Sequence, residues 1–359
     1  MRVGPAAALV DRRRVEGDVA VDPERGCVLE VGLPSPGGRG LVVPGLVDLQ
    51  VNGIGEVDLR DCGPEGYATA AIALAAAGTT AVQPTLHSMA PPGYEGALAV
   101  IAEVHARPPA GCRILPAHLE GPFLSPLWAG AHDRTHLIEP DPVVLRRLLA
   151  AGPVGFVTLA PELPGALDLV RDLAGRGVVV SVGHSDADAG GTVAALDAGA
   201  HHLTHCWNAH RRLSARDPGP AAVALGDPRA TVGLIGDLVH VAAEVVKLTF
   251  AAARGRVAVT SDSVAVPAGG AATVVDGVAR RPDGTIAGGV SRPDDCLRNL
   301  VALGLPLADA VDACGGVQRR LLGLPDVQVR PGDPADLVVL DDGLRPVRTL
   351  VGGVEHWCA

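Results

Sequence analysis

The chain of 359 residues is poor in aromatic side chains, which make up only 2% of it. Hydrophobic residues reach 48% and charged residues 19%, so aliphatic side chains must fill a sizeable core and a disordered chain is excluded. Lysine is almost absent, with Lys247 as the single example, and the 30 basic residues are spread along a chain of net charge −10. Because they form no basic stripe, we expect no nucleic-acid partner.

Long apolar segments and paired cysteine motifs are missing as well. No apolar run approaches the roughly 20 residues that a bilayer-spanning helix needs. The apolar start of the chain is followed at once by Asp11 and three arginines, which argues against a signal peptide. The seven cysteines are scattered and show no CxxC spacing. We therefore expect reduced thiols, a cytoplasmic protein and no membrane partner.

From residue 41 onward the chain repeats one rhythm: a β-branched run, a polar loop and an Ala/Leu-rich helical stretch. The eight strand-like runs are 41–51, 79–86, 113–119, 155–160, 178–182, 201–205, 231–235 and 257–260. The helical stretches between them are 65–77, 94–106, 141–151, 166–175, 186–198, 221–225 and 242–254. Eight such units predict the α/β class and a (β/α)8 TIM-type barrel, with its active site at the C-terminal ends of the strands.

The two ends of the chain follow a different pattern. Residues 1–42 contain short alternating apolar runs broken by Pro and Gly, which indicates β-structure without helix. Beyond the barrel, helical stretches at 294–303 and 306–322 precede strand-like segments at 332–340, 349–351 and 354–357. We expect a small flanking β-domain built from residues 1–42 and 326–359, with the barrel over 43–325.

Four side chains able to bind a metal or carry a proton directly follow strand-like runs. Glu120, His184 and His205 follow the third, fifth and sixth runs, and Asp262 follows the eighth. Each alone is compatible with a turn or a hydrogen-bonded core residue. Together at one rim, two imidazoles and a carboxylate form the ligand set of a catalytic zinc with an open position, and Asp262 is placed to act as general base. The pattern predicts metal-assisted hydrolysis.

Motifs along most of the chain resemble those of the N-acetylglucosamine-6-phosphate deacetylase family of the amidohydrolase superfamily. The resemblance covers residues 44 to 354. The motifs are PGLVDLQVNG (44–53), HLEGPF (118–123), GHSDA (183–187), THCWNA (204–209), RDPG (216–219), LVHV (238–241), TSDS (260–263) and GDPADLVVLD (332–341).

This resemblance implies a role for each matching residue. It makes Glu120, His184 and His205 the metal ligands and Asp262 the acid/base. His132 would polarise the amide carbonyl and stabilise the oxyanion. The substrate-binding residues would be Asn208 and Ala209 at the sugar phosphate, Arg216 at the phosphate, His240 at the sugar and Gln50 near the metal or its water. The resemblance also implies a homodimer in which an arginine-bearing loop reaches the neighbouring subunit's site.

The sequence departs from the superfamily pattern at one place and from the pattern of the deacetylase family at two others. Gln50-Val51-Asn52 stands where the superfamily usually has HxH, and amides are weak ligands, so we expect one divalent ion per subunit: Zn²⁺, with Fe²⁺ or Mn²⁺ as alternatives. The 288–293 loop and His210 also differ, and both touch expected substrate contacts. Arg292 in that loop offers a second anion contact.

The expected function is hydrolysis of the acetamide of N-acetylglucosamine 6-phosphate to glucosamine 6-phosphate and acetate. One alternative is an amidohydrolase acting on a different N-acylated or cyclic amide. Another, from a different class, is a non-catalytic sugar-phosphate sensor on the same scaffold. Metal content separates the sensor from the enzymes, since a sensor has no need of a catalytic ion.

Overall fold

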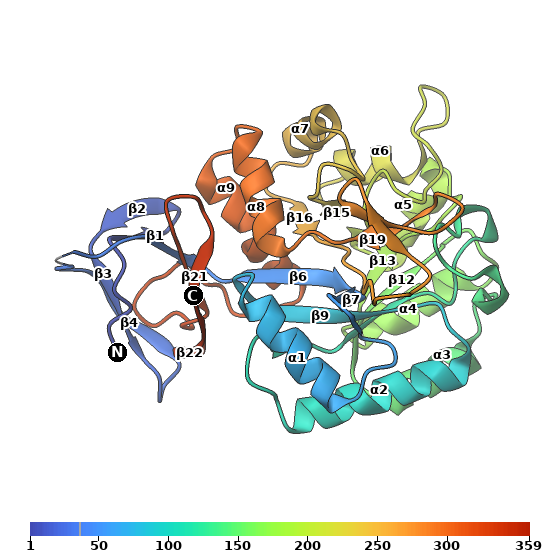
Figure 1. Cartoon of the computed structure of the whole chain (residues 1–359). Coiled ribbons are helices and arrows are strands. Elements are labelled where there is room, and N and C mark those ends of the chain that lie inside the picture. The colour runs from blue at the N-terminus through green and yellow to red at the C-terminus, as the bar shows by residue number, and fades with distance from the viewer. Residues whose placement is uncertain (36) are drawn as a thin grey trace.

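Eight parallel strands form a nearly closed barrel in the larger lobe of the molecule (Figure 1). The computed structural model describes residues 1–35 and 37–359. The barrel strands are β6 (Leu46–Val51), β9 (Thr79–His87), β11 (Ala117–Glu120), β12 (Val154–Leu159), β13 (Val179–Val182), β14 (His202–Leu203), β15 (Thr231–Ile235) and β16 (Val257–Thr260). They follow one another around the sheet in chain order, and a short strand β10 (Arg113–Ile114) also pairs with β9. The predicted barrel is confirmed.

The barrel closes between its first and last strands at a buried carboxylate. Val51 and Ser263 form an isolated parallel bridge there. Asp48 of β6 accepts hydrogen bonds from the hydroxyl of Thr260, from the backbone NH of Ser261 at 3.1 Å and from its hydroxyl at 2.6 Å. These contacts hold the end of β16, and hence the following Asp262, against β6.

Helices between the strands cover the outside of the barrel. They are α1 (Pro64–Ala75), α2 (Pro91–Ala106), α3 (Pro142–Ala151), α4 (Ala166–Gly175), α5 (Ala189–Ala198), α6 (Gly219–Gly226) and α7 (Ala243–Ala252), followed by α8 (Pro293–Ala302). Asp141 caps α3 as its sequence suggests, accepting from the NH groups of Val143 and Val144 at 2.6 and 3.3 Å.

The expected helix at 306–322 is interrupted. It consists of α9 (Leu307–Val311), a π-helical turn (Asp312–Gly316) and α10 (Val317–Leu321). The turn lies against the backbone at the start of β6, where a Cβ on Gly315 would stand 2.9 Å from the carbonyl oxygen of Gly45. Gly315 therefore allows a close approach that the hydrophobic pattern does not reveal.

The smaller lobe contains a six-stranded sheet to which both ends of the chain contribute (Figure 1). Its strand order is β2 (Arg13–Glu16), β1 (Ala7–Val10), β5 (Leu41–Pro44), β20 (Leu337–Leu340), β21 (Pro346–Val351) and β22 (Val354–Cys358). β3 (Asp18–Asp22) and β4 (Cys27–Leu33) form an antiparallel pair. A flanking β-structure from both termini is thus confirmed.

The predicted strand 41–51 is divided between the two lobes. β5 pairs with β1 and β20, whereas β6 pairs with β9. The chain changes sheets at Gly45, where a Cβ would approach the side chain of Thr80 to 2.1 Å. The expected domain limit at residue 42 falls inside β5, and the three-part division stays a prediction.

Two small sheets at the barrel mouth were not predicted. β7 (Gly53–Ile54) pairs with β8 (Val57–Asp58), and β17 (Thr273–Val275), β18 (Val278–Arg280) and β19 (Ile286–Gly289) form a three-stranded sheet. β19 is tied to the end of the eighth barrel strand, because Gly289 donates its NH to the carbonyl oxygen of Asp262 at 2.8 Å. This sheet therefore covers the rim where the predicted site residues lie.

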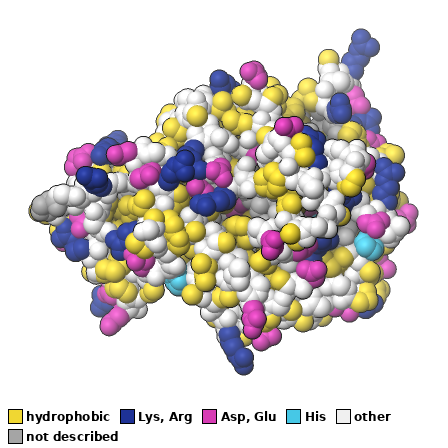
Figure 2. Space-filling model, in the orientation of Figure 1, with side chains coloured by type: hydrophobic (Ala, Val, Ile, Leu, Met, Phe, Trp, Pro, Cys, Tyr) yellow, Lys and Arg dark blue, Asp and Glu magenta, His cyan; other side chains and the backbone are white. Residues whose placement is uncertain are grey.

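On the face seen in Figure 2, Lys and Arg side chains are scattered among Asp and Glu. Among the described residues, no helix combines the length and apolar character needed to cross a bilayer.

Candidate metal centre and active site

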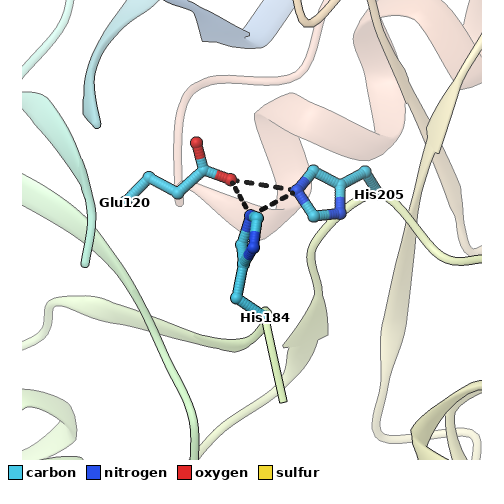
Figure 3. Close-up of side chains that lie close together, drawn as sticks. All are labelled: Glu120, His184 and His205. Carbon is cyan, nitrogen blue, oxygen red and sulfur yellow. Dashed lines mark hydrogen bonds and ion pairs between the residues drawn. The ribbon is translucent and has the colours of Figure 1, made fainter. Parts of the chain in front are cut away.

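Glu120, His184 and His205 converge at the rim of the barrel (Figure 3). Glu120 Oε1 lies 3.2 Å from His184 Nε2 and 3.0 Å from His205 Nε2, and the two Nε2 atoms are 3.2 Å apart. All three side chains are buried. The structure thus brings together the three residues that the sequence placed at separate strand ends.

The hydrogen bonds behind the two imidazoles fix their tautomers. His184 donates from Nδ1 to the carbonyl oxygen of Trp128 at 2.8 Å, and His205 donates from Nδ1 to that of Asn208 at 3.1 Å. In neutral rings the two Nε2 atoms then carry lone pairs that face each other and the carboxylate. Three converging acceptors repel one another unless a cation lies between them. This donor set fits one divalent metal ion.

The backbone around the site is held in an unusual conformation. His184, His205 and Asp262 have φ values of 47°, 31° and 47°, in the left-handed region that non-glycine residues seldom adopt. Such residues cost on the order of 1–3 kcal/mol each and cluster at functional sites. The sharp turn directly after each strand aims the side chain across the barrel mouth.

Gln50 in the first barrel strand and Asn52 directly after it each support a site carboxylate. Gln50 donates from Nε2 to Glu120 Oε1 at 2.9 Å, and Asn52 donates from Nδ2 to Asp262 Oδ1 at 3.1 Å. Burial, and then the negative charge of Glu120, raise the pKa of Asp262 to about 8. A dication held by Glu120 would reverse the second effect and favour the ionised base.

His132 is held as a neutral hydrogen-bond donor. Ser88 donates its backbone NH to His132 Nδ1 at 3.2 Å, so the ring proton is on Nε2, which lies 3.7 Å from Glu120 Oε2. Burial, reinforced by the neighbouring His184, holds the pKa of His132 well below its usual value. The ring therefore presents an N–H beside the metal ligands at neutral pH.

A cavity of about 420 Å³ opens over these residues. Glu120, His132, His184, His205, Asn208, Ala209, His240 and Asp262 all line it. The Nδ2 group of Asn208 is buried and finds no partner among the described residues, so it has a donor free for a ligand. His240 is oriented by Asp237, which lies 2.6 Å from its Nδ1.

Known proteins of similar sequence match the chain over most of its length. No family model matches the chain. It is 34% identical to human N-acetylglucosamine-6-phosphate deacetylase over 351 residues, which cover 90% of this chain and 85% of the human protein. It is 32% identical to N-acetylgalactosamine-6-phosphate deacetylase of Escherichia coli O157:H7 over 327 residues, 87% of each chain.

A solved structure agrees with these sequence relatives. It is an Asp-to-Ala mutant of N-acetyl-D-glucosamine-6-phosphate deacetylase from Mycobacterium smegmatis in complex with N-acetyl-D-glucosamine 6-phosphate. Its TM-score is 0.91 at 32% identity, and the match covers 99% of this chain and 98% of that one. The chain belongs to the N-acetylglucosamine-6-phosphate deacetylase family. The resemblance to this family of the amidohydrolase superfamily is thus confirmed.

Some residues to which the resemblance assigns a role in substrate binding do not line the cavity. Arg216 is on an exposed loop and does not line it, so its phosphate contact stays a prediction. Gln50 donates a hydrogen bond to the carboxylate of the metal-binding residue Glu120 and does not line the cavity. His210 is bonded through Nε2 to the carbonyl oxygen of Thr204.

Arg292 is bound elsewhere in the structure. It pairs with Asp294 at 2.9 Å and donates to the carbonyl oxygen of Ala76 at 2.8 Å. It does not line the cavity and does not supply the second anion contact expected from the sequence of this deacetylase. Of the divergent 288–293 loop, Gly288 is the residue that does line the cavity.

Several cavity residues were missed by sequence reasoning about the deacetylase site. They are Asn52, Asp58, Arg60, His87 and Arg281. His87 ends β9 and Asn52 follows β6, so the rule that found Glu120 also applies to them. Arg281 lies in a segment that joins β18 to β19, for which no pattern predicted a place over the mouth.

Proposed function

We propose that this chain is a metal-dependent deacetylase that hydrolyses the acetamide of N-acetylglucosamine 6-phosphate to glucosamine 6-phosphate and acetate. The observation that carries the proposal is the convergence of three ligand atoms, within 4.8 Å of one another, beside Asp262 in one cavity. We propose Zn²⁺, one ion per subunit, with Fe²⁺ and Mn²⁺ as alternatives, since all three accept two imidazoles and a carboxylate.

Each residue has a distinct part in the reaction. A divalent ion held by Glu120, His184 and His205 supplies Lewis-acid activation of the attacking water and the amide carbonyl. His132 donates its Nε2–H to the carbonyl oxygen as negative charge develops on it. Asp262 takes the proton of the attacking water and returns it to the leaving nitrogen as the C–N bond breaks. Asn52 keeps Asp262 oriented for both transfers.

The sugar phosphate is proposed to lie on the side of the metal-binding residues where Asn208 and Ala209 line the cavity. The free Nδ2 donor of Asn208 and the backbone of Ala209, both of which line the cavity, offer hydrogen bonds to it. With Nδ1 bound to Asp237, His240 has Nε2 available for a sugar hydroxyl.

A homodimer accounts for the exposed position of Arg216. The loop that carries it adjoins an apolar groove, which offers a surface for a second copy. The groove is lined by Trp207, Leu213, Ala222, Leu225, Gly226, Val245, Leu248 and Ala252. In such a dimer Arg216 contributes to the partner's cavity.

A cytoplasmic location is proposed from the seven cysteines, all of which are free thiols.

The C4 epimer is a second candidate substrate. The relative from Escherichia coli O157:H7 that shares 32% identity is named an N-acetylgalactosamine-6-phosphate deacetylase. Only the contact with the C4 hydroxyl distinguishes the two sugars, and His240 is the residue proposed to make sugar contacts.

The test is amine release from four compounds by the purified protein: both N-acetylhexosamine 6-phosphates and their unphosphorylated forms. We expect the N-acetylglucosamine phosphate to be the best substrate. A higher kcat/KM for the galactosamine epimer would assign the second candidate. Equal rates with and without phosphate would contradict phosphate recognition, and no hydrolysis with a stoichiometric metal ion present would overturn the function.

A further inference from the structure

The cavity has two ends on opposite sides of the metal ligands. In a closed sheet of eight strands, the second and sixth strands face each other across the barrel. His87 ends the second, β9, while Asn208 and Ala209 follow the sixth, β14. The imidazole rings of His87, His132, His184 and His205 follow one another at centroid separations of 5.8, 4.4 and 4.9 Å. His87 is therefore the far end of a row that leads across the site to Asn208.

Two guanidinium groups gather at the end near β9, which we call the strand-two end: Asp58, Arg60, His87 and Arg281. Arg60 binds Asp58 through Nε at 3.0 Å and Nη2 at 2.6 Å, and its Nη1 contacts His87 Nε2. Burial, together with Arg60, lowers the pKa of His87 to about 4, so this imidazole is neutral. The strand-two end thus carries one net positive charge.

Arg281 is the guanidinium without an acidic partner. It donates from Nη2 to the carbonyl oxygen of Ala131 at 2.5 Å, next to the catalytic His132. Among the residues that the structure describes, no carboxylate forms an ion pair with it. Asp133 and Asp283 interact electrostatically with Arg281 only at longer range, and both aspartates are exposed. Its remaining N–H groups are available to a ligand in the cavity.

Beyond its carbonyl, the acetyl group of the proposed substrate has no polar or charged atom that could bind the guanidinium of Arg281. If Asn208 and Ala209 hold the sugar phosphate and the carbonyl lies beside His132, the acyl substituent points toward the strand-two end. An acetyl group places only a methyl there. Arg281 is an exposed residue that lines the cavity, and its guanidinium fork is suited to a carboxylate.

We propose that the strand-two end binds a carboxylate at the far end of the acyl group, so that this deacetylase also hydrolyses amino-sugar phosphates whose N-acyl chain ends in a carboxylate, such as N-malonyl. Arg281 is the residue that determines this specificity. The reaction is the same hydrolysis: water oxygen bonds to the amide carbonyl carbon, the C–N bond breaks, the nitrogen gains a proton, and the acyl group leaves as a dicarboxylate. The inference rests on the proposed function of the same site.

The test compares kcat/KM for N-malonylglucosamine 6-phosphate and N-acetylglucosamine 6-phosphate in the wild-type metalloenzyme and three variants. We expect wild type to hydrolyse both, and Arg281→Ala to lower the malonyl-to-acetyl ratio of kcat/KM at least about tenfold, as expected for loss of a hydrogen bond to a charged group. Arg281→Lys should lower it less, because charge is kept and the fork is lost.

Arg280→Ala is the matched control. Arg280 is the preceding residue, at the end of β18; it bonds the carbonyl oxygen of Gly284 at 3.1 Å and does not line the cavity, so the ratio should not change. If only the acetyl substrate is hydrolysed, or Arg281→Ala leaves the ratio unchanged, the inference is wrong and the proposed function stands. If neither substrate is hydrolysed, both the inference and the proposed function are wrong.

The product acetate is the other source of a carboxylate at this end. Acetate inhibition of wild type is measured alongside the two substrates. Inhibition that weakens in Arg281→Ala, with no hydrolysis of the malonyl substrate, would assign the strand-two end to the departing acetate and overturn the inference.

Discussion

At the scale of single residues, the site works by placing each proton at a defined atom. Backbone carbonyls fix the protons of His184 and His205 on Nδ1, and the NH of Ser88 fixes that of His132 on Nε2. Two rings therefore face the ligand position with lone pairs and one faces the substrate with a donor. The proposed chemistry follows from this division.

Asp262→Asn is predicted to retain the metal and lose turnover. The amide keeps the shape of the side chain but cannot accept a proton, and loss of a general base typically lowers kcat about a hundredfold to ten-thousandfold. Turnover and metal content are measured on the same preparation. Near-normal kcat in the metal-loaded variant would remove the base assignment.

Gln50→Leu is predicted to weaken metal binding about 10- to 100-fold, the usual effect of removing a hydrogen bond behind a ligand. The reason is its 2.9 Å bond to Glu120 Oε1. Chelator competition measures the affinity. Gln328→Leu, which removes a half-buried glutamine bonded to Asp326 in the smaller lobe, serves as the control and should bind the ion normally.

At the scale of elements, the decisive feature is how strands end. β13, β14 and β16 are each followed within three residues by a left-handed turn that bears a site side chain. Asp48 secures the last of these turns against β6.

Asp48→Ala is predicted to lower the free energy of unfolding by about 1–3 kcal/mol, because the buried donors of Thr260 and Ser261 lose their acceptor. Burial raises the pKa of Asp48, although the hydrogen bonds it accepts oppose this shift. Urea denaturation measures the loss. Asp168→Ala, an exposed aspartate in the first turn of α4, should cost much less, and equal losses would contradict the role given to Asp48.

The elements that could be predicted are those whose signal is local. The apolar runs and the polar residue after each are present in the sequence, so the barrel, Glu120, His184, His205 and Asp262 followed from it. The exchange of sheets at Gly45 did not, because 41–51 is mostly apolar on both sides of Gly45 and the break depends on the approach of Thr80. β17–β19 were missed because short, half-exposed strands carry little periodicity.

At the scale of the whole molecule, the two lobes are joined at a buried ion cluster. Asp336, next to β20, accepts from Arg319 Nη2 and Arg113 Nη1, both at 3.0 Å, and from the NH of Gly352 at 2.8 Å. Arg319 is 2% exposed. Barrel, C-terminal helix and small sheet thus meet at one carboxylate.

Asp336→Ala is predicted to lower the free energy of unfolding by about 3–5 kcal/mol, since it leaves the Arg319 charge buried without a partner. Burial opposes ionisation, but the two arginines outweigh it and lower the pKa of Asp336. The stabilisation is therefore present above the ordinary carboxyl pKa and lost as pH falls through the lower folded-state value.

Unfolding curves at pH 7 and in the acid range check both statements. Asp342→Ala, at an exposed aspartate in the turn before β21, is the control and should behave like wild type. A wild-type-like Asp336→Ala protein would show that the lobes are held by other contacts.

The central claim is that Glu120, His184 and His205 share one divalent ion, and X-ray absorption at the metal edge of the purified protein tests it most directly. We predict about one ion per chain with two imidazole nitrogens and a carboxylate oxygen among its ligands, and loss of that ion in His184→Ala. A protein that hydrolyses the substrate without a stoichiometric ion, or an ion that keeps its ligands in His184→Ala, would contradict the account.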